Sequence, residues 1–138
     1  MTFDLERFVA AQDGLHGAVL GELRRRRKTG HWIWFVFPQI AGLGQSAMSR
    51  EYAIGSLAEA KAYLDHPILG PRLIEACQAL LLHRERAAVD ILGSIDATKV
   101  RSSATLFRAA APDITVFGEI LDAFYGGKAD EATLARLG

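Results

Sequence analysis

The chain has 138 residues, half of them hydrophobic, and its sixteen basic residues are balanced by sixteen acidic ones, so its formal charge is zero. This length suits a single domain over residues 1–138 that buries its own core, and the balanced charge creates no overall attraction for nucleic acid or anionic membranes. The one cysteine, Cys77, excludes an internal disulfide and is typical of a reducing compartment, so we expect a cytoplasmic protein.

No segment predicts a cleavable leader or a membrane span. The N-terminal sequence MTFDLERF carries two acids and lacks an apolar run of the length that a signal peptide needs. The longest strictly apolar run covers six residues, 32–37, far short of the roughly twenty residues that cross a bilayer. We therefore expect a soluble protein without a membrane partner.

Helical periodicity dominates the first part of the chain. Apolar residues at helical spacing between positions 5 and 27, interrupted by Asp13-Gly14, predict two successive helices or one kinked helix that ends at Thr29-Gly30. Residues 33–37 are β-branched or aromatic, but a lone strand would leave its backbone groups unpaired. We expect a buried helical turn or an extended connector there, followed by a glycine-containing loop at residues 40–44 that would form the rim of a pocket.

Capping signals mark the helices that follow. Ser46 is placed to cap a short helix, and Ser56 with Glu59 has the spacing of a capping box at the start of another. His66-Pro67 ends that second helix, because proline lacks the N–H group and restricts the residue before it. Gly70-Pro71 opens the next helix, whose apolar stripe runs through residues 73–81.

The C-terminal half continues the same pattern. Apolar periodicity predicts helices over residues 95–110 and 116–124, ended by Pro112 and by Gly126-Gly127, and Asp130 is placed to cap a last short helix. The chain therefore predicts an all-α domain of about six to eight short-to-medium helices, with an aromatic-rich connector after the N-terminal helices.

Several motifs occur in an order that is found in a known family. They are Phe3-Asp4-Leu5, Arg7-Phe8, His31-Trp32, Trp34-Phe35, Phe37-Pro38-Gln39, Gly42-Leu43-Gly44, Tyr52-Ala53-Ile54, His66-Pro67, Leu69-Gly70, Lys99, Arg101-Ser102-Ser103, Thr105-Leu106-Phe107, Asp130 and Thr133-Leu134. On these motifs the chain resembles the bacterial and fungal family catalogued as domain of unknown function 1810. The resemblance implies a compact helical domain without an established activity. The calpastatin-like label sometimes attached to the family does not fit, because such an inhibitor is a polar, disordered segment.

The first candidate site is the segment RRRRKTGHWIWFVFPQ at residues 24–39, where five successive cations precede a ring-rich stretch. His31, the indole N–H groups of Trp32 and Trp34, and the Gln39 amide all need polar partners when they are buried. Together with Phe35 they predict the lining of a pocket that stacks a base or a sugar. The alternative is a structural aromatic core, in which His31 bonds to carbonyl groups at a helix end.

The second candidate site is the helical segment KVRSS at residues 99–103. Lys99 and Ser103 lie one turn apart beside an apolar face, with Arg101 on the opposite flank, so the segment could grip a phosphate or a carboxylate. Alternatively, Ser103 bonds back to the carbonyl of Lys99, and both basic side chains are solvated. The candidate catalytic residues are thus His31, Lys99 and Ser103, and the candidate ligand-binding residues are Trp32, Trp34, Phe35, Gln39 and Arg101.

Other classes of site find little support. The four histidines lack the spacing of metal ligands, and no phosphate-binding glycine motif or nucleophile elbow is present, so we expect neither a metal nor a cofactor. The basic residues 24–28 would point around the whole circumference of a helix, and Glu22 and Arg26 would form an ion pair one turn apart. Nucleic acid is therefore not an expected partner.

Two functions follow from these candidates. The first is a small-molecule site for a nucleotide-like or ADP-ribose-like ligand, which includes hydrolysis of an N-glycosidic or phosphoester bond. The NAD- and ADP-ribose-associated N-glycosidases are similar in size and class, although their catalytic residues do not match this chain one by one. The second is a non-enzymatic adaptor that binds a partner protein through the aromatic segment or through the corner at residues 66–71. The reaction, the substrate and the oligomeric state are left open.

Overall fold

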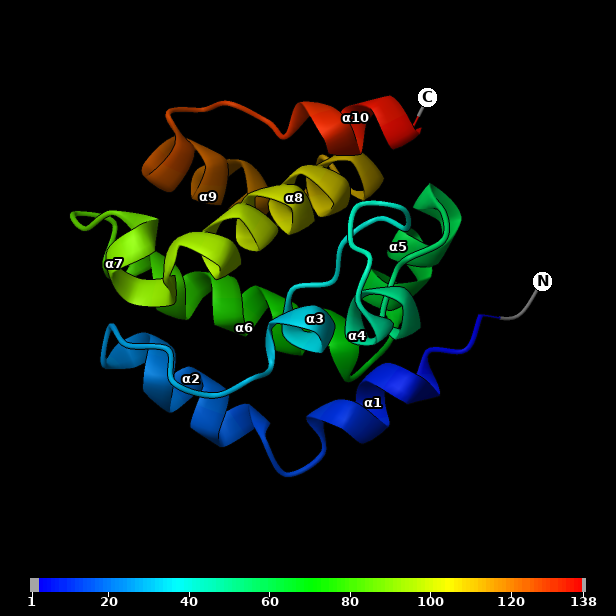
Figure 1. Ribbon diagram of the computed structural model, residues 1–138, viewed down its shortest axis with the longest axis horizontal. Coiled ribbons are helices and arrows are strands. Elements are labelled where there is room, and N and C mark those ends of the chain that lie inside the picture. Colours follow the sequence, from blue (N-terminus) through cyan, green and yellow to red (C-terminus); the bar gives the residue numbers. More distant parts are fainter. Residues whose placement is uncertain (1–2, 138) are drawn as a thin grey trace.

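The computed structural model describes residues 3–137, so residues 1, 2 and 138 of the expected domain lie outside the described range. The described residues form ten helices (Figure 1), and the predicted all-α fold is confirmed. The helices are α1 (Glu6–Gln12), α2 (His16–Arg24), α3 (Ile33–Val36), α4 (Ala47–Glu51), α5 (Leu57–Asp65), α6 (Leu69–Leu81), α7 (Ala88–Leu92), α8 (Ser94–Ala110), α9 (Val116–Tyr125) and α10 (Glu131–Leu137).

The number of helices exceeds the expected six to eight because two short elements, α3 and α7, are helical. The aromatic connector thus adopts the helical-turn form of the two that the sequence allowed. Within the described residues, β-type pairing is limited to one parallel bridge between Ile40 and Ile54. No helix in residues 3–137 combines the length and the apolar character that a membrane crossing requires.

The helix α8 is the centre of the packing. It contacts α5, α7, α9 and α10, while α6 contacts α2, α5 and α9 on the other side of the core. In Figure 1, α9 and α10 lie along one edge of the molecule and α1 and α2 along the opposite edge. Three rings from different helices meet in the core, since the ring centroid of Phe107 lies 5.3 Å from that of Tyr63 and 5.7 Å from that of Phe117.

The predicted helix caps at Ser46 and Ser56 are present, and one hydrogen bond of the capping box has a different donor. Ser46 Oγ accepts a hydrogen bond from the Ser49 N–H at 3.1 Å, and Ser56 Oγ accepts one from the Glu59 N–H at 3.1 Å. The Glu59 carboxylate accepts from the N–H of Gly55 at 2.7 Å, where the capping-box pattern predicted Ser56 as its donor. These hydrogen bonds satisfy donors that would otherwise be unpaired at the helix starts.

The helix α2 ends at Arg24, three residues before the expected end. The N–H of Arg26 donates to the carbonyl of Leu23 and that of Arg27 donates to the carbonyl of Glu22, with Arg26 in the left-handed region at φ 63°. This pattern is a Schellman motif, which turns the chain sharply out of the helix. The expected ion pair between Glu22 and Arg26 is therefore wrong, because Arg26 has left the helix.

Candidate functional site

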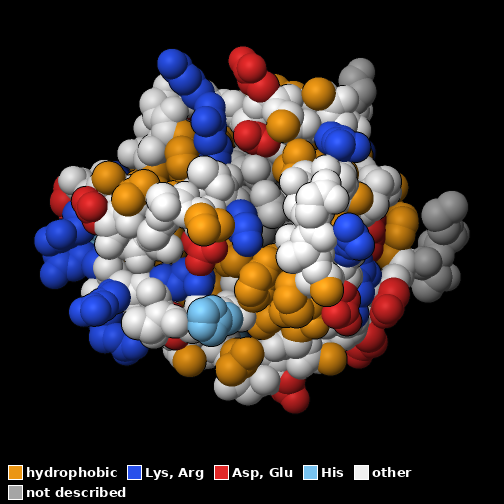
Figure 2. Space-filling view, viewed as in Figure 1, with side chains coloured by type: hydrophobic (Ala, Val, Ile, Leu, Met, Phe, Trp, Pro, Cys, Tyr) orange, Lys and Arg blue, Asp and Glu red, His pale blue; other side chains and the backbone are white. Residues whose placement is uncertain are grey.

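An open cleft of about 520 Å³ lies between α3 and the junction of α7 with α8, and we call it the α3–α8 cleft. Figure 2 shows this face of the molecule hollowed near its centre, where charged side chains lie beside hydrophobic surface. Four stretches of the chain line the cleft; they contribute Lys28, His31, Ile33 and Trp34, then Ser46, then Leu92, Gly93, Ser94, Ile95 and Asp96, and finally Lys99.

One wall of the cleft brings together the two segments that the sequence singled out. The Nζ atom of Lys99 lies 4.9 Å from the ring centroid of Trp34, which is cation–π distance. In the described part of the chain Lys99 forms no ion pair, so its charge is available to the cleft. The exposed side chain of His31 lines the same cleft. Three candidate residues, His31, Trp34 and Lys99, therefore share one concave surface.

The start of α8 forms the opposite side of the cleft. Gly93 occupies the N-cap position with φ 85°, a conformation that suits glycine, and no side chain caps the helix. The first backbone N–H groups of a helix lack partners within it, and with the helix dipole they favour an anion. Asp96 in this first turn pairs with Lys28 at 2.7 Å, so its negative charge is balanced.

A buried glutamate holds the segment that carries the aromatic residues. The Oε1 atom of Glu22 accepts hydrogen bonds from the N–H groups of Thr29 at 2.7 Å and Gly30 at 2.8 Å, and from Nε1 of Trp32 at 3.1 Å. Burial raises the pKa of Glu22, but these hydrogen bonds and the charge of Lys28 outweigh it, and the pKa lies below its ordinary value. This role of Glu22 was not predicted from the sequence, although Glu22 stands among buried apolar positions of α2.

Four candidate residues lie outside the cleft. Trp32 and Phe35 are buried in the hydrophobic core. The backbone carbonyl of Gln39 accepts from the Ile54 N–H at the β-bridge, and its side chain does not line the cleft. Arg101 donates to the carbonyl groups of residues 128 and 129 at 2.9 and 3.1 Å, and so ties the segment before α10 to α8. These residues hold the fold around the cleft.

Ser103 lies behind the wall of the cleft with 1% of its surface exposed. Its Oγ atom has no hydrogen-bond partner, so the bond to the carbonyl of Lys99, which was the alternative for this residue, is absent. Ser102 and Thr105 do bond back to carbonyl groups one turn earlier in α8. Nε1 of Trp34 is also buried without a partner. Both unpaired groups belong to the two helices that form the cleft, and buried unpaired groups are rare enough to require an explanation.

Another histidine makes the helix-end contact expected of His31. Nε2 of His83 lies 2.9 Å from the carbonyl oxygen of Arg24, the last residue of α2. The contact joins the turn after α6 to the end of α2. No such bond holds His31 in the described part of the chain, which leaves its ring free toward the cleft.

The comparisons with known proteins agree with this fold. A family model described as protein of unknown function (DUF1810) matches residues 2–137. The chain belongs to this family. The crystal structure of the conserved hypothetical protein Rv1873 from Mycobacterium tuberculosis is similar at 47% identity and a TM-score of 0.95, and the match covers 98% of this chain and 96% of that one. No curated protein matches the chain significantly.

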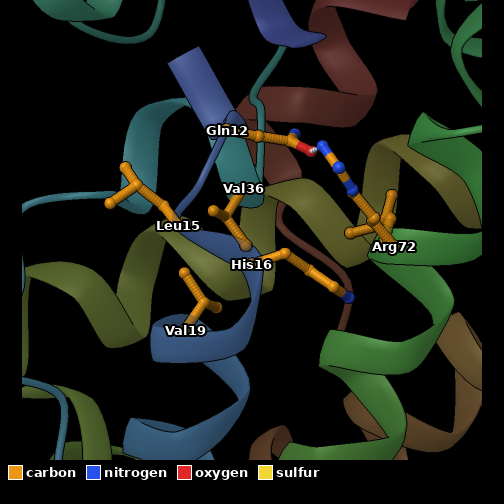
Figure 3. Close-up of a pocket in the computed structure, with 7 residues that line it drawn as sticks. Gln12, Leu15, His16, Val19, Val36 and Arg72 are labelled. Atoms are coloured by element: carbon orange, nitrogen blue, oxygen red, sulfur yellow. Dashed lines mark hydrogen bonds between the residues drawn. The ribbon is translucent and has the colours of Figure 1, made fainter. Parts of the chain in front are cut away.

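Another hollow of this DUF1810 protein, between the start of α2 and α6, is too small for a ligand. It has a volume of about 10 Å³, close to the smallest that holds one water molecule. Figure 3 shows that its residues come from the end of α1, from the start of α2, from α3 and from α6. Arg72 donates to the Gln12 side-chain oxygen at 3.4 Å. Its lining comprises Gln12, Leu15, His16, Val19, Val36, Arg72 and Leu73.

Neither a cluster of metal-ligand side chains nor an exposed thiol occurs among the described residues of this DUF1810 protein. Residues 3–137 contain no group of three or more His, Cys, Asp or Glu side chains that could hold a metal ion. Cys77 is buried, and burial raises the pKa of its thiol far above the ordinary value. A protonated, buried thiol is a poor nucleophile.

Proposed function

We propose that the α3–α8 cleft binds a small anionic ligand with a planar ring, of the nucleotide or ADP-ribose kind. The observation that carries the proposal is the meeting of His31, Trp34 and Lys99 beside the uncapped first turn of α8. The volume of about 520 Å³ also lies within the range of roughly 300–1,000 Å³ that is usual for small-molecule sites.

The anionic part of the ligand follows from the charges of the cleft. Lys28 and Asp96 neutralise each other, which leaves the ammonium group of Lys99 and the start of a 17-residue helix. Both favour a negatively charged group, and a phosphate accepts hydrogen bonds from both at once. A neutral ligand would leave these groups without an acceptor.

The planar part of the ligand follows from Trp34. Its indole face already attracts the ammonium group of Lys99 at 4.9 Å. A base that enters the cleft takes the place of the ammonium group on this face, because stacking on an aromatic side chain stabilises any base. The displaced ammonium group then pairs with the phosphate, so one movement of Lys99 serves both parts of the ligand.

Hydrolysis of an N-glycosidic or phosphoester bond is the reaction that we propose for this ligand. The exposed imidazole of His31 would take a proton from a water molecule as its oxygen bonds to the sugar carbon or to phosphorus. The leaving group departs with the bonding electron pair and receives a proton from the imidazolium group of His31, directly or through solvent. With 1% of its surface exposed, Ser103 does not reach the cleft as a nucleophile, so we assign the attack to water.

A thermal-shift series tests the binding proposal. A ligand that binds only the folded protein at 100 times its dissociation constant stabilises it by about 2.7 kcal/mol, so AMP and ADP-ribose should raise the melting temperature by several degrees. Adenosine, which lacks the phosphate, should raise it less. Lys99→Ala and Trp34→Ala should reduce the shift, whereas the exposed control Lys128→Ala should not. An equal shift in all three variants, or none in the wild type, would refute the proposal.

The alternative adaptor function has little exposed apolar surface through which to bind a partner protein. Trp32, Phe35 and Phe37 are buried, so the aromatic segment offers no continuous apolar face to a partner. At the corner of residues 66–71, Ile68 is the large hydrophobic residue at the surface, with 40% of its area exposed. A single half-exposed side chain does not make an interface, so we propose the ligand site as the function. The cytoplasmic location expected from Cys77 remains a prediction.

A further inference from the structure

Six arginines gather where two turns of the chain meet, and we call them the arginine cluster. One turn follows α2, the other follows α6, and the contact between His83 and the carbonyl of Arg24 joins them. In Figure 2 basic side chains crowd the left edge of the molecule, beside the end of α2 and the turn before α7. All six side chains are exposed; they are Arg24, Arg25, Arg26, Arg27, Arg84 and Arg86.

The cluster is not balanced by acids. In the described part of the chain none of its arginines forms an ion pair, and the two turns contain one acid, Glu85. The total charge of the chain is zero, so the rest of the surface is correspondingly acidic and the charge is unevenly distributed. Arg26 also adopts a left-handed conformation at φ 63°, where glycine or asparagine is the usual residue. Arg26 therefore adopts a backbone conformation that is unfavourable for arginine.

The cluster leads into the α3–α8 cleft. Arg27 is followed directly by Lys28, which lines the cleft. His31, which also lines the cleft, is four residues after Arg27. Four residues span at most about 14 Å. The backbone N–H of Lys28 donates to the carbonyl of Ile91 at 2.9 Å, which fixes this segment against α7 at the edge of the cleft.

We propose that the arginine cluster holds the phosphates of a single-stranded nucleic acid whose terminal nucleotide occupies the α3–α8 cleft. This proposal rests on the proposed function and names its ligand class. The guanidinium group binds phosphate through two parallel hydrogen bonds, which a lysine cannot do, and four of the five basic residues at positions 24–28 are arginines. The strand must be single, because a base held in a duplex is not free to stack on Trp34.

The basic run at residues 24–28 did not predict a nucleic-acid partner, because five basic residues on one helix would point in all directions. The helix ends at Arg24, however, and the next three arginines lie in a turn. The contact of His83 brings the second turn, with Arg86, to the same region, while Arg84 lines a hollow on the side of that turn toward α9. The geometric objection therefore does not apply to the folded chain.

Binding of a fluorescently labelled single-stranded RNA of about twelve nucleotides, followed by anisotropy at several salt concentrations, tests this proposal. The double variant Arg25→Gln/Arg27→Gln should weaken binding about tenfold and flatten the dependence of log affinity on log salt by about 1.4. The matched control Arg50→Gln/Lys61→Gln removes the same charge from exposed positions of α4 and α5 and should leave binding unchanged. Arg86→Gln, from the other turn, should weaken binding less than the double variant.

Further measurements separate this proposal from the proposed function. The AMP-induced thermal shift should be the same in Arg25→Gln/Arg27→Gln as in the wild type, while Trp34→Ala should weaken both AMP and RNA. An AMP shift without RNA binding, or equal RNA binding in the double variant and its control, would overturn the nucleic-acid proposal alone. RNA binding that is unaffected by Trp34→Ala, in a protein that shows no AMP-induced shift, would overturn the claim that the terminal nucleotide of the RNA occupies the α3–α8 cleft. Binding to phosphatidylserine vesicles in place of RNA would make a membrane surface the partner and would also overturn the proposal.

Discussion

Trp32 and Trp34 stand two positions apart, yet their indole N–H groups have opposite environments. Nε1 of Trp32 donates to the buried carboxylate of Glu22 at 3.1 Å, whereas Nε1 of Trp34 is buried without a partner. A lost hydrogen bond to a charged group costs about 1.5–3 kcal/mol, but removal of an unpaired buried donor relieves a desolvation cost. The same substitution should therefore have different effects at the two positions.

We predict that Trp32→Phe lowers the free energy of unfolding by about 3 kcal/mol, because the lost hydrogen bond adds to the loss of packing. Trp34→Phe should lower it by less than about 1 kcal/mol, because the lost volume is offset by removal of the unpaired N–H group. Urea unfolding of both variants measures the difference. Equal losses would mean that the two indole groups have equivalent partners in solution.

At the scale of an element, the segment between α2 and α3 depends on Glu22. The segment has no regular structure over residues 28–32, and the Glu22 carboxylate accepts the N–H groups of Thr29 and Gly30. The pKa of Glu22 is lowered from its ordinary value of 4.5. A lowered pKa means that the ionised form stabilises the fold, so this stability is present above pH 4.5 and is lost as the pH falls through the lower folded-state value.

We predict that Glu22→Gln lowers the free energy of unfolding by about 2 kcal/mol at pH 7, because an uncharged amide oxygen is a weaker acceptor. The difference from the wild type should shrink as the pH falls from 4.5 through the lower folded-state pKa of Glu22, where the carboxylate of the folded protein becomes protonated. Urea titrations between pH 7 and pH 3 measure it. The exposed control Glu51→Gln should show little difference at any pH. A difference for Glu22→Gln that stays constant across this range would contradict the assignment.

The sequence predicted the helices better than the segments between them. Local rules placed the helix over residues 95–110 and the caps at Ser46 and Ser56, because periodicity and capping depend on neighbours in the chain. The early end of α2 was not predictable in this way, since Arg26 takes a position at which glycine is the usual signal. The role of Glu22 depends on a chain reversal, which no local spacing reveals.

At the scale of the whole molecule, the same distinction applies to the candidate site. Trp34 and Lys99 were separate signals in the sequence, and only the folded chain places the Nζ atom of Lys99 4.9 Å from the ring centroid of Trp34. The sequence also grouped Trp32 and Phe35 with Trp34, because residue type does not tell which rings of a short helical turn face the core. The arginine cluster likewise requires the contact between two turns that are 59 positions apart. Long-range contacts therefore decide which residues form the site.

The packing of α5 against α6 shows how much the whole core depends on one close approach. Gly70 is buried in the first turn of α6, and a Cβ atom there would lie 2.1 Å from the carbonyl oxygen of Leu64, a backbone atom of α5. The helix α5 also contacts α8, and α6 also contacts α2 and α9. A side chain at position 70 would thus push apart two helices that both pack against the other helices of the core.

We predict that Gly70→Ala lowers the free energy of unfolding by about 3 kcal/mol or more, because the clash is with backbone and no rotamer change relieves it. The melting temperature should fall by about 10 °C in a single cooperative transition, since the displaced helices belong to one core. Gly17→Ala is the matched control, because a Cβ atom in this turn of α2 meets nothing within 4 Å. Alanine there should stabilise the helix by about 0.5–1 kcal/mol. Calorimetry of both variants tests the argument, and a separate low-temperature transition in Gly70→Ala would show that α5 and α6 unfold independently of the remaining helices.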